Sequence, residues 1–296
     1  MKIMLIGKTG QVGWELERTL APLGKVSAWG EAELDITNSA LLAKTIQQVS
    51  PDLIINAAAY TAVDRAEQDV ELSEQVNGFA TGVMAETAKI LGAVLIHIST
   101  DYVFDGTKGS AYLETDIPNP INQYGRSKLR GEQVIQQVGG SYLILRTSCV
   151  YNQWSDNFVT KVLAWARKQA QLRIVADQIG NPTWARLLAE TITVLVARAG
   201  VDPMQYFGQR SGIYHLAGRG AASRYEWAQA ALEFDPQRDE QVVQTLEPVT
   251  TSAFPTPAIR PLFTALNCTH FEKTFQLEIP SWRESLQLAL KSIPSR

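Results

Sequence analysis

Tyr124 and Lys128 stand four residues apart in the stretch NQYGRSKLRGE, residues 122–132. At this spacing they share a helix face, so the ammonium can lie close to the phenol. A phenol has a pKa near 10, and a neighbouring positive charge lowers that pKa by favouring the ionised form. A tyrosine tuned in this way can give a proton to a ketone oxygen while hydride arrives at the carbon. The alternative is an ordinary solvated helix face, because Y-x-x-x-K also occurs by chance.

A glycine-rich turn, GKTGQVG at residues 7–13, follows the first apolar run and opens a helical pattern marked by Val12, Leu16 and Leu20. Glycine allows the backbone to approach a pyrophosphate, and a helix N-terminus offers it free N–H groups. Three glycines also occur in ordinary loops. Their position at the first strand-helix junction favours dinucleotide binding.

Hydroxyl groups follow a later apolar run, in the stretch ISTDYVFDG at residues 98–106. Side chains at the carboxyl end of a strand can point into the crevice where such sheets bind ligands, although Ser, Thr and Asp also cap turns. Thr100 could therefore hydrogen-bond the ketone oxygen that Tyr124 protonates. Together with the glycine turn, these residues predict ketone and alcohol redox chemistry.

The elements that must position these residues alternate along the chain. Apolar runs without polar alternation, as expected for strands of a buried parallel sheet, occupy residues 3–6, 53–55, 94–98 and 142–145. Segments of helical period lie between them, so residues 1–150 are predicted to form a doubly wound α/β domain with a Rossmann fold. The less regular residues 151–296 are expected to form mainly a smaller α/β substrate-binding domain, with part of this later chain returning to the first domain.

Composition agrees with an ordinary globular protein: 45% of the 296 residues are apolar, 19% are charged, and the net charge is −3. Charges of both signs are mixed, which gives no indication of nucleic acid or membrane as a partner. Cys149 and Cys268 lack the spacing of a zinc site or a disulfide framework. The first apolar run is too short for a secretory signal, so we expect a cytoplasmic protein.

Six ordered motifs resemble the dTDP-4-dehydrorhamnose reductase family of the extended short-chain dehydrogenase/reductase superfamily: GKTGQVGWEL, INAAAYTAVDRAE, STDYVFDG, YGRSKLRGE, DQIGNPT and RPLFTALN. The resemblance spans nearly the whole chain. It implies reduction of the C4 ketone of dTDP-4-dehydro-L-rhamnose by NADPH or NADH, the last step of dTDP-L-rhamnose synthesis for bacterial surface polysaccharides. It also implies a monomer or homodimer acting on a dTDP-4-keto-6-deoxy sugar.

The resemblance also assigns roles to individual residues. Tyr124 corresponds to the proton donor, Lys128 to the residue that holds the nicotinamide ribose, and Thr100 to the hydroxyl that aligns the substrate. The remaining cofactor positions are Gly7, Gly10, Gln11, Val12, Gly13, Asp35, Ile36, Ala57, Ala59 and Thr61. The nucleotide-sugar pocket is expected to include Asp101, Asn157, Thr183 and Arg260. The arginine fork suits a diphosphate.

Three departures from the family pattern affect these expectations. Family members commonly read RTSWVYG where this chain has RTSCVYN at residues 146–152. The tryptophan could stack on the sugar or base, so Cys149 at its position puts the exact fit of the substrate in doubt. Gly30 replaces an acidic residue at the end of the second strand, and no arginine stands there to bind a 2′-phosphate, so the choice between NADH and NADPH stays open. Arg186 occupies the position of a carboxylate used by members that dimerise through magnesium, which disfavours a metal-bridged dimer.

Other functions fit parts of the pattern. A nucleotide-sugar dehydratase is disfavoured because Tyr102, rather than a glutamate base, follows the Thr-Asp pair. Another nucleotide-sugar reductase or epimerase remains an alternative. So does a non-catalytic NADP-binding regulatory subunit like the β subunit of methionine adenosyltransferase, which resembles this family and can keep Y-x-x-x-K.

Overall fold

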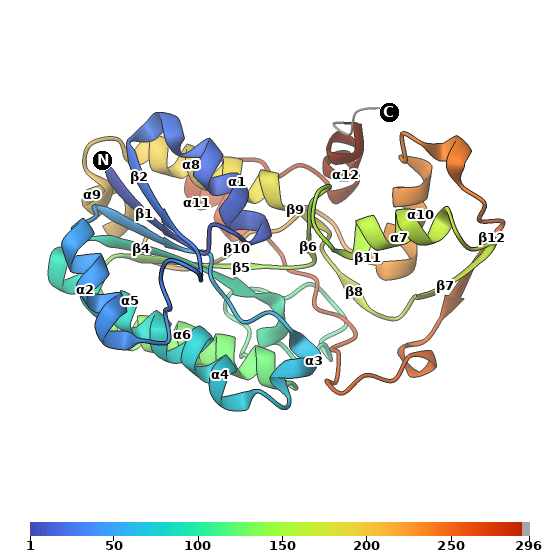
Figure 1. The fold of residues 1–296 in the computed structure, drawn as a ribbon, viewed down its shortest axis with the longest axis horizontal. Helices are drawn as coiled ribbons and strands as arrows, with labels where there is room; N and C mark the ends of the chain where they lie inside the picture. Colours follow the sequence, from blue (N-terminus) through green and yellow to red (C-terminus); the bar gives the residue numbers. More distant parts are fainter. Residues whose placement is uncertain (292–296) are drawn as a thin grey trace.

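A six-stranded parallel sheet forms the centre of the first of two lobes in the computed structural model, which describes residues 1–291 (Figure 1). The strand order is β10-β5-β4-β3-β1-β2. These strands are β1 (Lys2–Ile6), β2 (Lys25–Trp29), β3 (Leu53–Asn56), β4 (Val94–Thr100), β5 (Tyr142–Thr147) and β10 (Gly212–His215). The four predicted buried runs coincide with β1, β3, β4 and β5, and the predicted doubly wound fold is confirmed.

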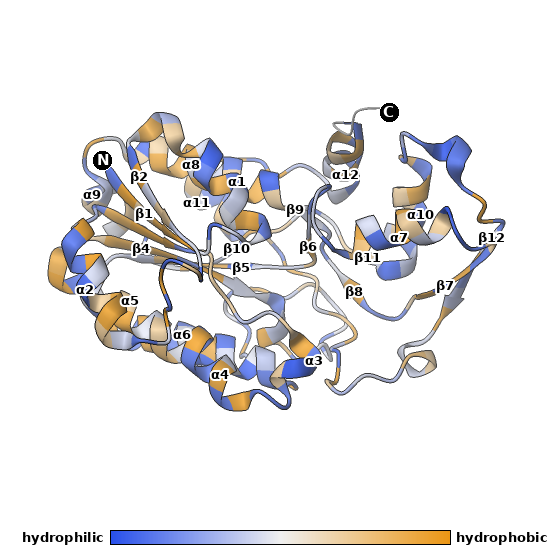
Figure 2. Cartoon of the chain, viewed as in Figure 1, coloured by the Kyte–Doolittle hydropathy of each residue, from blue (hydrophilic) through white to orange (hydrophobic). Residues whose placement is uncertain are grey.

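Helices cover both faces of this sheet because its strands are apolar on both sides. Ile3 and Leu5 of β1 pack in one cluster, while Met4 and Ile6 pack in another, as the two-residue period of a strand requires. Figure 2 shows how hydrophobic residues concentrate in β1 and β4. The first cluster includes residues of α1 (Gln11–Thr19), α8 (Ala185–Ala199), α9 (Pro203–Gly208) and α11 (Thr269–Phe275). The second includes residues of α2 (Ser39–Val49), α5 (Ala80–Leu91) and α6 (Gln123–Val138).

A second lobe has its own apolar core, which includes Tyr151 and Trp227. Its helices are α7 (Phe158–Ala166), α10 (Arg224–Glu233) and α12 (Trp282–Lys291), and its short strands pair as β6 (Val150–Tyr151) with β9 (Thr183–Trp184), β7 (Gln171–Val175) with β12 (Thr245–Val249), and β8 (Ile179–Gly180) with β11 (Ala222–Ser223). The later chain also contributes β10, α8 and α11 to the first lobe. The predicted second domain ends at residue 296, and its residues 292–296 lie outside the described part.

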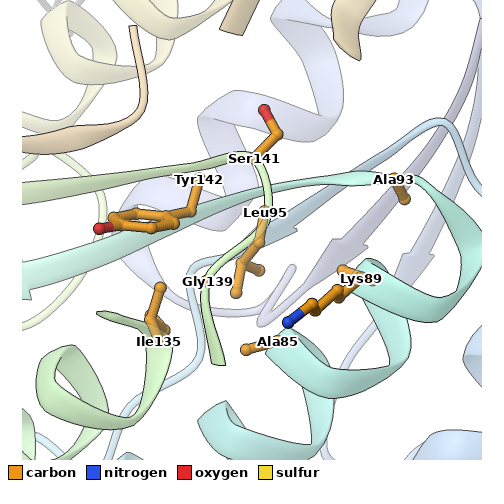
Figure 3. Close-up of a pocket in the computed structure, with 9 residues that line it drawn as sticks. Ala85, Lys89, Ala93, Leu95, Ile135, Gly139, Ser141 and Tyr142 are labelled. Atoms are coloured by element: carbon orange, nitrogen blue, oxygen red, sulfur yellow. The ribbon is translucent and has the colours of Figure 1, made fainter. Parts of the chain in front are cut away.

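Short helical turns complete the fold. They are η1 (Ala21–Leu23), α3 (Val63–Ala66), α4 (Val70–Glu74), the π-helix η2 (Gln75–Phe79), η3 (Asp101–Val103), η4 (Arg238–Glu240) and η5 (Thr251–Ala253). A narrow crevice between α5 and the starts of β4 and β5 is lined by Ala85, Leu95 and Tyr142 (Figure 3). It lies at the amino ends of these strands, away from the predicted site. Among residues 1–291, no helix has the length and apolar character needed to cross a membrane.

Candidate active site

The carboxyl ends of β1, β3 and β4 bring the predicted catalytic and cofactor residues to one edge of the sheet, where ligands bind in folds of this kind. Thr100 is the last residue of β4. Nearby, Asn122 caps the start of α6, where its Oδ1 accepts from the Gly125 N–H at 2.8 Å. A Cβ atom at Gly125 would lie 2.1 Å from the Tyr102 carbonyl oxygen. Glycine next to Tyr124 therefore permits α6 to approach the segment that follows β4.

Tyr124 lies on α6, with its phenol hydrogen-bonded to the Thr100 hydroxyl and its ring edge-on to Tyr102 at a centroid distance of 5.8 Å. The structure thus brings together the two predicted catalytic hydroxyls. Burial raises the pKa of the Tyr124 phenol, and the Thr100 hydrogen bond only partly opposes this shift. The expected lowering of this pKa by Lys128 was wrong, since desolvation dominates. A raised pKa keeps the phenol protonated, as a proton donor requires.

Lys128 is 1% exposed and lies on the same helix, one turn beyond Tyr124. Its Nζ donates to the Ile98 carbonyl at 2.7 Å and lies 3.1 Å from Nε2 of His97. Burial lowers the pKa of Lys128 to about 8, while the charge of Glu132 acts in the opposite direction. The predicted lysine is therefore in place, but its contacts are with β4.

Asp101 is buried, and its carboxylate accepts hydrogen bonds from three hydroxyls. Thr100 donates to Oδ1 at 3.1 Å, while Ser148 and Thr264 donate to Oδ2 at 2.8 and 2.5 Å. Burial raises the pKa of this carboxyl, and the three hydroxyls oppose the shift. The predicted contact of Asp101 with substrate stays a prediction; in the structure its carboxylate connects Thr100 to Ser148 and Thr264.

The glycine turn follows β1 as predicted. Gly7 has a φ of 92°, and a Cβ there would lie 2.5 Å from the Ala58 N atom. A Cβ at Gly13 would lie 2.0 Å from the Gly7 carbonyl oxygen, so glycine allows α1 to start against the loop. Gly10 precedes α1 without a side-chain cap, and the N–H groups of the first helical turn, which include Gln11, have no intrahelical acceptor. These groups fit a pyrophosphate.

The other predicted cofactor positions border this turn. Ala57, Ala59 and Thr61 lie in the segment that follows β3, and the Ala57 N–H donates to the Ile6 carbonyl at 2.9 Å. Asp35 and Ile36 lie in the loop after β2, where Asp35 accepts from the Thr37 N–H and hydroxyl. All five lie beyond the carboxyl ends of β2 and β3.

A charged pair at the end of β2 was missed in the sequence. Lys8 Nζ lies 2.6 Å from Glu33 Oε1, and Glu33 Oε2 accepts from the Gly30 N–H at 2.9 Å. Glu33 thus turns back toward the position where an acidic residue usually meets the adenosine ribose. The 25-residue separation of the two charges concealed their contact.

Two predicted substrate residues use their polar groups within the second lobe. Asn157 caps α7 by accepting from the Val159 and Thr160 N–H groups, and its amide donates to the Asn152 carbonyl at 2.8 Å. Thr183 is fully buried, donates to the Asn181 carbonyl and accepts from the Gly218 N–H. Both residues stabilise loops through contacts that substrate would have to replace.

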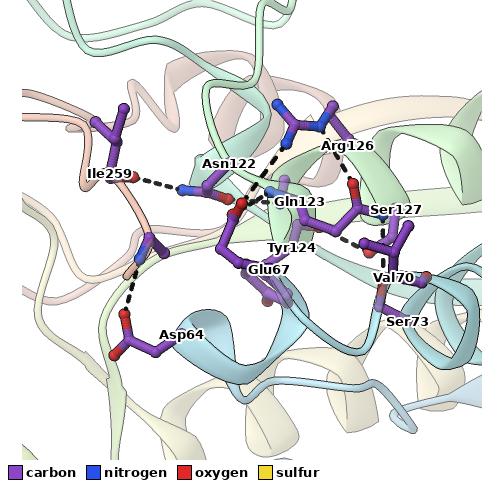
Figure 4. Close-up of polar contacts among 12 residues, drawn as sticks. Asp64, Glu67, Val70, Ser73, Asn122, Gln123, Tyr124, Arg126, Ser127 and Ile259 are labelled. Atoms are coloured by element: carbon purple, nitrogen blue, oxygen red, sulfur yellow. Dashed lines mark hydrogen bonds and ion pairs between the residues drawn. The ribbon is translucent and has the colours of Figure 1, made fainter. Parts of the chain in front are cut away.

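Arg260, the predicted diphosphate ligand, is paired with Asp64 of α3. Its Nη1 and Nη2 lie 2.9 and 2.7 Å from the two carboxylate oxygens, and this pair holds the Asp64 pKa below its ordinary value. Beside it, Asn122 donates to the Ile259 carbonyl at 2.9 Å, and the Ala258 N–H donates to Asp64 (Figure 4). These contacts fix residues 258–260 to α3 and to the start of α6.

Arg224, which the sequence reasoning did not select, lies nearer to the tyrosines. Its guanidinium hydrogen-bonds the Tyr102 side chain, donates to Gln178 Oε1 at 3.3 Å and lies 5.2 Å from the Phe158 ring centroid. Its charge also acts on Cys149, which has a φ of 46° and a pKa raised by burial. The hydrogen-bond partners of Arg224 named here are neutral, and the Asp101 carboxylate acts on it without a direct ion pair, so its guanidinium is suited to an anionic ligand. No local motif marked this arginine.

Arg186, which stands where some family members carry a carboxylate for a magnesium-bridged dimer, lies on α8 and faces Glu15 of α1. Arg186 Nε lies 2.7 Å from Glu190 Oε1, and its charge also reaches Glu15. Within residues 1–291, no group of three or more histidine, cysteine or acidic side chains is arranged to hold a metal ion.

Comparisons with known proteins agree with this architecture. A family model described as "RmlD substrate binding domain" matches residues 1–294. A dTDP-4-dehydrorhamnose reductase of Burkholderia thailandensis is 40% identical, with all of both chains covered, and that of Escherichia coli is 39% identical, with 99% of this chain and 98% of its own covered.

Solved structures extend the comparison. A dTDP-4-dehydrorhamnose reductase of Bacillus anthracis in complex with NADP has a TM-score of 0.88 and 32% identity, covering 99% of this chain and all of its own. A Thermus thermophilus UDP-glucose 4-epimerase shares the fold, with a TM-score of 0.78 at 18% identity, covering 98% of each chain. The family match over residues 1–294 and the full-length relatives place this chain in the RmlD family, that of the dTDP-4-dehydrorhamnose reductases.

Proposed function

We propose that this protein reduces the C4 ketone of dTDP-4-dehydro-L-rhamnose to dTDP-L-rhamnose, using NADPH or NADH. The observation that carries the proposal is the Tyr124–Thr100 hydroxyl pair at the carboxyl end of β4, with Lys128 one helical turn away. Full-length similarity to dTDP-4-dehydrorhamnose reductases supplies the substrate.

In this reaction the nicotinamide cofactor supplies hydride to C4. Tyr124 donates its phenolic proton to the carbonyl oxygen, and Thr100 aligns that oxygen by hydrogen bonding. In the structure the Thr100 hydroxyl donates to Asp101, so this proton would turn to the carbonyl oxygen when the substrate binds. The Tyr102 N–H, which donates to the Thr100 oxygen at 3.2 Å, holds that oxygen in position. The glycine turn and the segment after β3 would hold the cofactor, and the Lys128 amine would hold its nicotinamide ribose.

We further propose that the second lobe binds the nucleotide portion of the substrate. Arg224 supports this assignment better than Arg260, because Arg260 is already paired with Asp64. The expected cytoplasmic location and the monomeric or homodimeric state belong to the same proposal, and light scattering on purified protein would give the number of subunits.

The deciding experiment follows NADPH and NADH absorbance with purified protein and dTDP-4-dehydro-L-rhamnose. We expect cofactor oxidation that depends on the sugar, with dTDP-L-rhamnose formed in equal amount. A protein that binds NADPH without sugar-dependent oxidation would instead fit the regulatory-subunit alternative. Conversion of a dTDP-sugar without net consumption of cofactor would indicate an epimerase.

A further inference from the structure

His97 connects the end of β3 to the lysine beside Tyr124. It lies in β4, its side chain is fully buried, and its two ring nitrogens face different partners. Nδ1 lies 3.0 Å from Asn56 Nδ2, while Nε2 lies 3.1 Å from Lys128 Nζ. Asn56 is also fully buried, so this three-residue chain is shielded from water.

The orientation of the Asn56 amide is fixed by the backbone. Its Oδ1 accepts from the Ala58 N–H at 3.1 Å, and a backbone N–H can only donate. The amide nitrogen therefore faces His97 and donates to Nδ1. Burial holds the pKa of His97 well below its ordinary value, so the ring is neutral and carries one proton. With Nδ1 as acceptor, that proton resides on Nε2.

The Nε2 proton points toward Lys128, and this determines which form of the lysine fits. An ammonium has three donors and no lone pair, so it cannot accept from Nε2–H. A neutral amine can accept that proton and still donate to the Ile98 carbonyl, 2.7 Å away. The hydrogen-bond chain from Asn56 through His97 therefore favours the neutral amine.

The charged groups around Lys128 oppose this effect only in part. Glu132, two turns beyond Tyr124 on α6, favours the ammonium. Its carboxylate, however, is paired with Arg146 of β5 at 2.6 Å and accepts from Ser99 of β4 at 2.5 Å. The remaining titratable neighbour on this helix face, Tyr124, is held in its protonated form by burial. His97 is thus the titratable group in direct contact with Nζ.

We propose that His97 is a positioning residue, with its tautomer set by Asn56, that donates to Lys128 and thereby determines how this lysine titrates during turnover. The proposal rests on the function assigned above to Tyr124 and Lys128. It adds a fully buried residue that acts through the lysine.

The first test measures the tautomer in the unmodified protein. Long-range ¹H–¹⁵N NMR distinguishes protonated from unprotonated ring nitrogens, and the chain has only three histidines. We expect Nε2 of His97 to be protonated and Nδ1 unprotonated, with the signal assigned by its loss in His97→Gln. A proton found on Nδ1 would overturn the proposal.

The second test reverses the hydrogen-bond chain. Asn56→Asp keeps an acceptor for the Ala58 N–H but presents an acceptor to Nδ1, so the ring proton moves there and Nε2 accepts from the ammonium. His97→Gln offers Lys128 an amide oxygen. Each change should raise the Lys128 pKa by about one unit or more, measured by NMR of ¹³Cε-labelled lysine; His215→Gln, at another buried histidine, should leave it unchanged.

An unchanged Lys128 titration in both folded variants would overturn the proposal. Otherwise, the alkaline limb of the kcat profile should move to higher pH with the NMR midpoint. If the midpoint moves while the kcat profile does not, His97 sets the lysine pKa as proposed, and the catalytic role assigned to Lys128 is wrong. The NMR readout therefore separates this inference from the proposed function.

Discussion

The sheet edge beside Tyr124 and the motif residues of the second lobe use their polar groups in opposite ways. At the sheet edge, the first turn of α1 begins without a side-chain cap, and the Tyr124 phenol adjoins Thr100. In the second lobe, Asn157 caps a helix and Thr183 bonds two backbone segments. The difference teaches that a motif residue can use in the architecture the same polar groups that a ligand would need.

The largest expected effect tests the sheet edge. Tyr124→Phe removes the phenolic proton and leaves the ring, so kcat should fall roughly a hundredfold or more. NADPH affinity should be nearly unchanged, because the glycine turn is untouched. Stopped-flow turnover and fluorescence titration of the cofactor measure the two quantities.

Tyr102→Phe is a matched control, since this ring packs edge-on against Tyr124 but is not the proposed donor. It should lose far less activity. Full activity in Tyr124→Phe would show that Tyr124 has only a structural role.

Two substitutions in the glycine turn distinguish an effect on packing from an effect on cofactor binding. Gly13→Ala puts a Cβ 2.0 Å from the Gly7 carbonyl, so the loop must move, and both thermal stability and NADPH affinity should fall, the affinity by about tenfold or more. Gly10→Ala makes only an ordinary 3.5 Å contact with the same oxygen. Its melting temperature should stay close to that of the wild type while NADPH binds more weakly. Equal melting temperatures for all three proteins would contradict this distinction.

Local patterns predicted the first lobe well for a physical reason. Buried parallel strands must be apolar, and residues four apart on a helix must share a face, so β1, β4 and the Tyr124–Lys128 pair can be found without tertiary information. The tertiary partners of charged and polar residues cannot be found in this way. Lys8 and Glu33 meet across 25 residues, and Asp101 meets Thr264 across 163, through folding alone.

The expected pKa of Tyr124 was wrong for a related reason. Spacing indicates which charge can lie near a phenol, but it does not give the desolvation that results from packing α6 against the segment after β4. That desolvation outweighs the favourable contacts. His97 was also overlooked, because a histidine inside an apolar strand has no local signature of its partner.

Two arginines provide a sharper test of the second lobe. Arg224→Ala should raise the substrate KM about tenfold, because it removes a guanidinium whose hydrogen-bond partners are neutral. Arg260→Ala should raise KM by only about twofold, since Arg260 is paired with Asp64. Steady-state kinetics with dTDP-4-dehydro-L-rhamnose measures both. A larger KM effect for Arg260→Ala than for Arg224→Ala would indicate that Arg260 binds the diphosphate. Its ion pair with Asp64 would then have to open when substrate binds.

The smallest effect concerns the link between residues 258–260 and α3. Asp64→Asn weakens the Arg260 pair, whose carboxylate side chain is 39% exposed, so unfolding should become easier by only about 0.5–1 kcal/mol at neutral pH. Because the folded-state pKa of Asp64 is lowered, its contribution is present above the unfolded pKa of about 4 and is lost as pH falls through the folded value.

The stability difference from wild type should therefore shrink as urea unfolding is repeated below pH 4, the ordinary range of this carboxyl. Glu278→Gln, at the more exposed pair with Arg219, is the control and should change little at any pH. A difference at Asp64 that persisted in acid would mean that the carboxylate charge is not what stabilises this contact. The retained Ala258 N–H bond would then be the main link between residues 258–260 and α3, because an asparagine oxygen can still accept it.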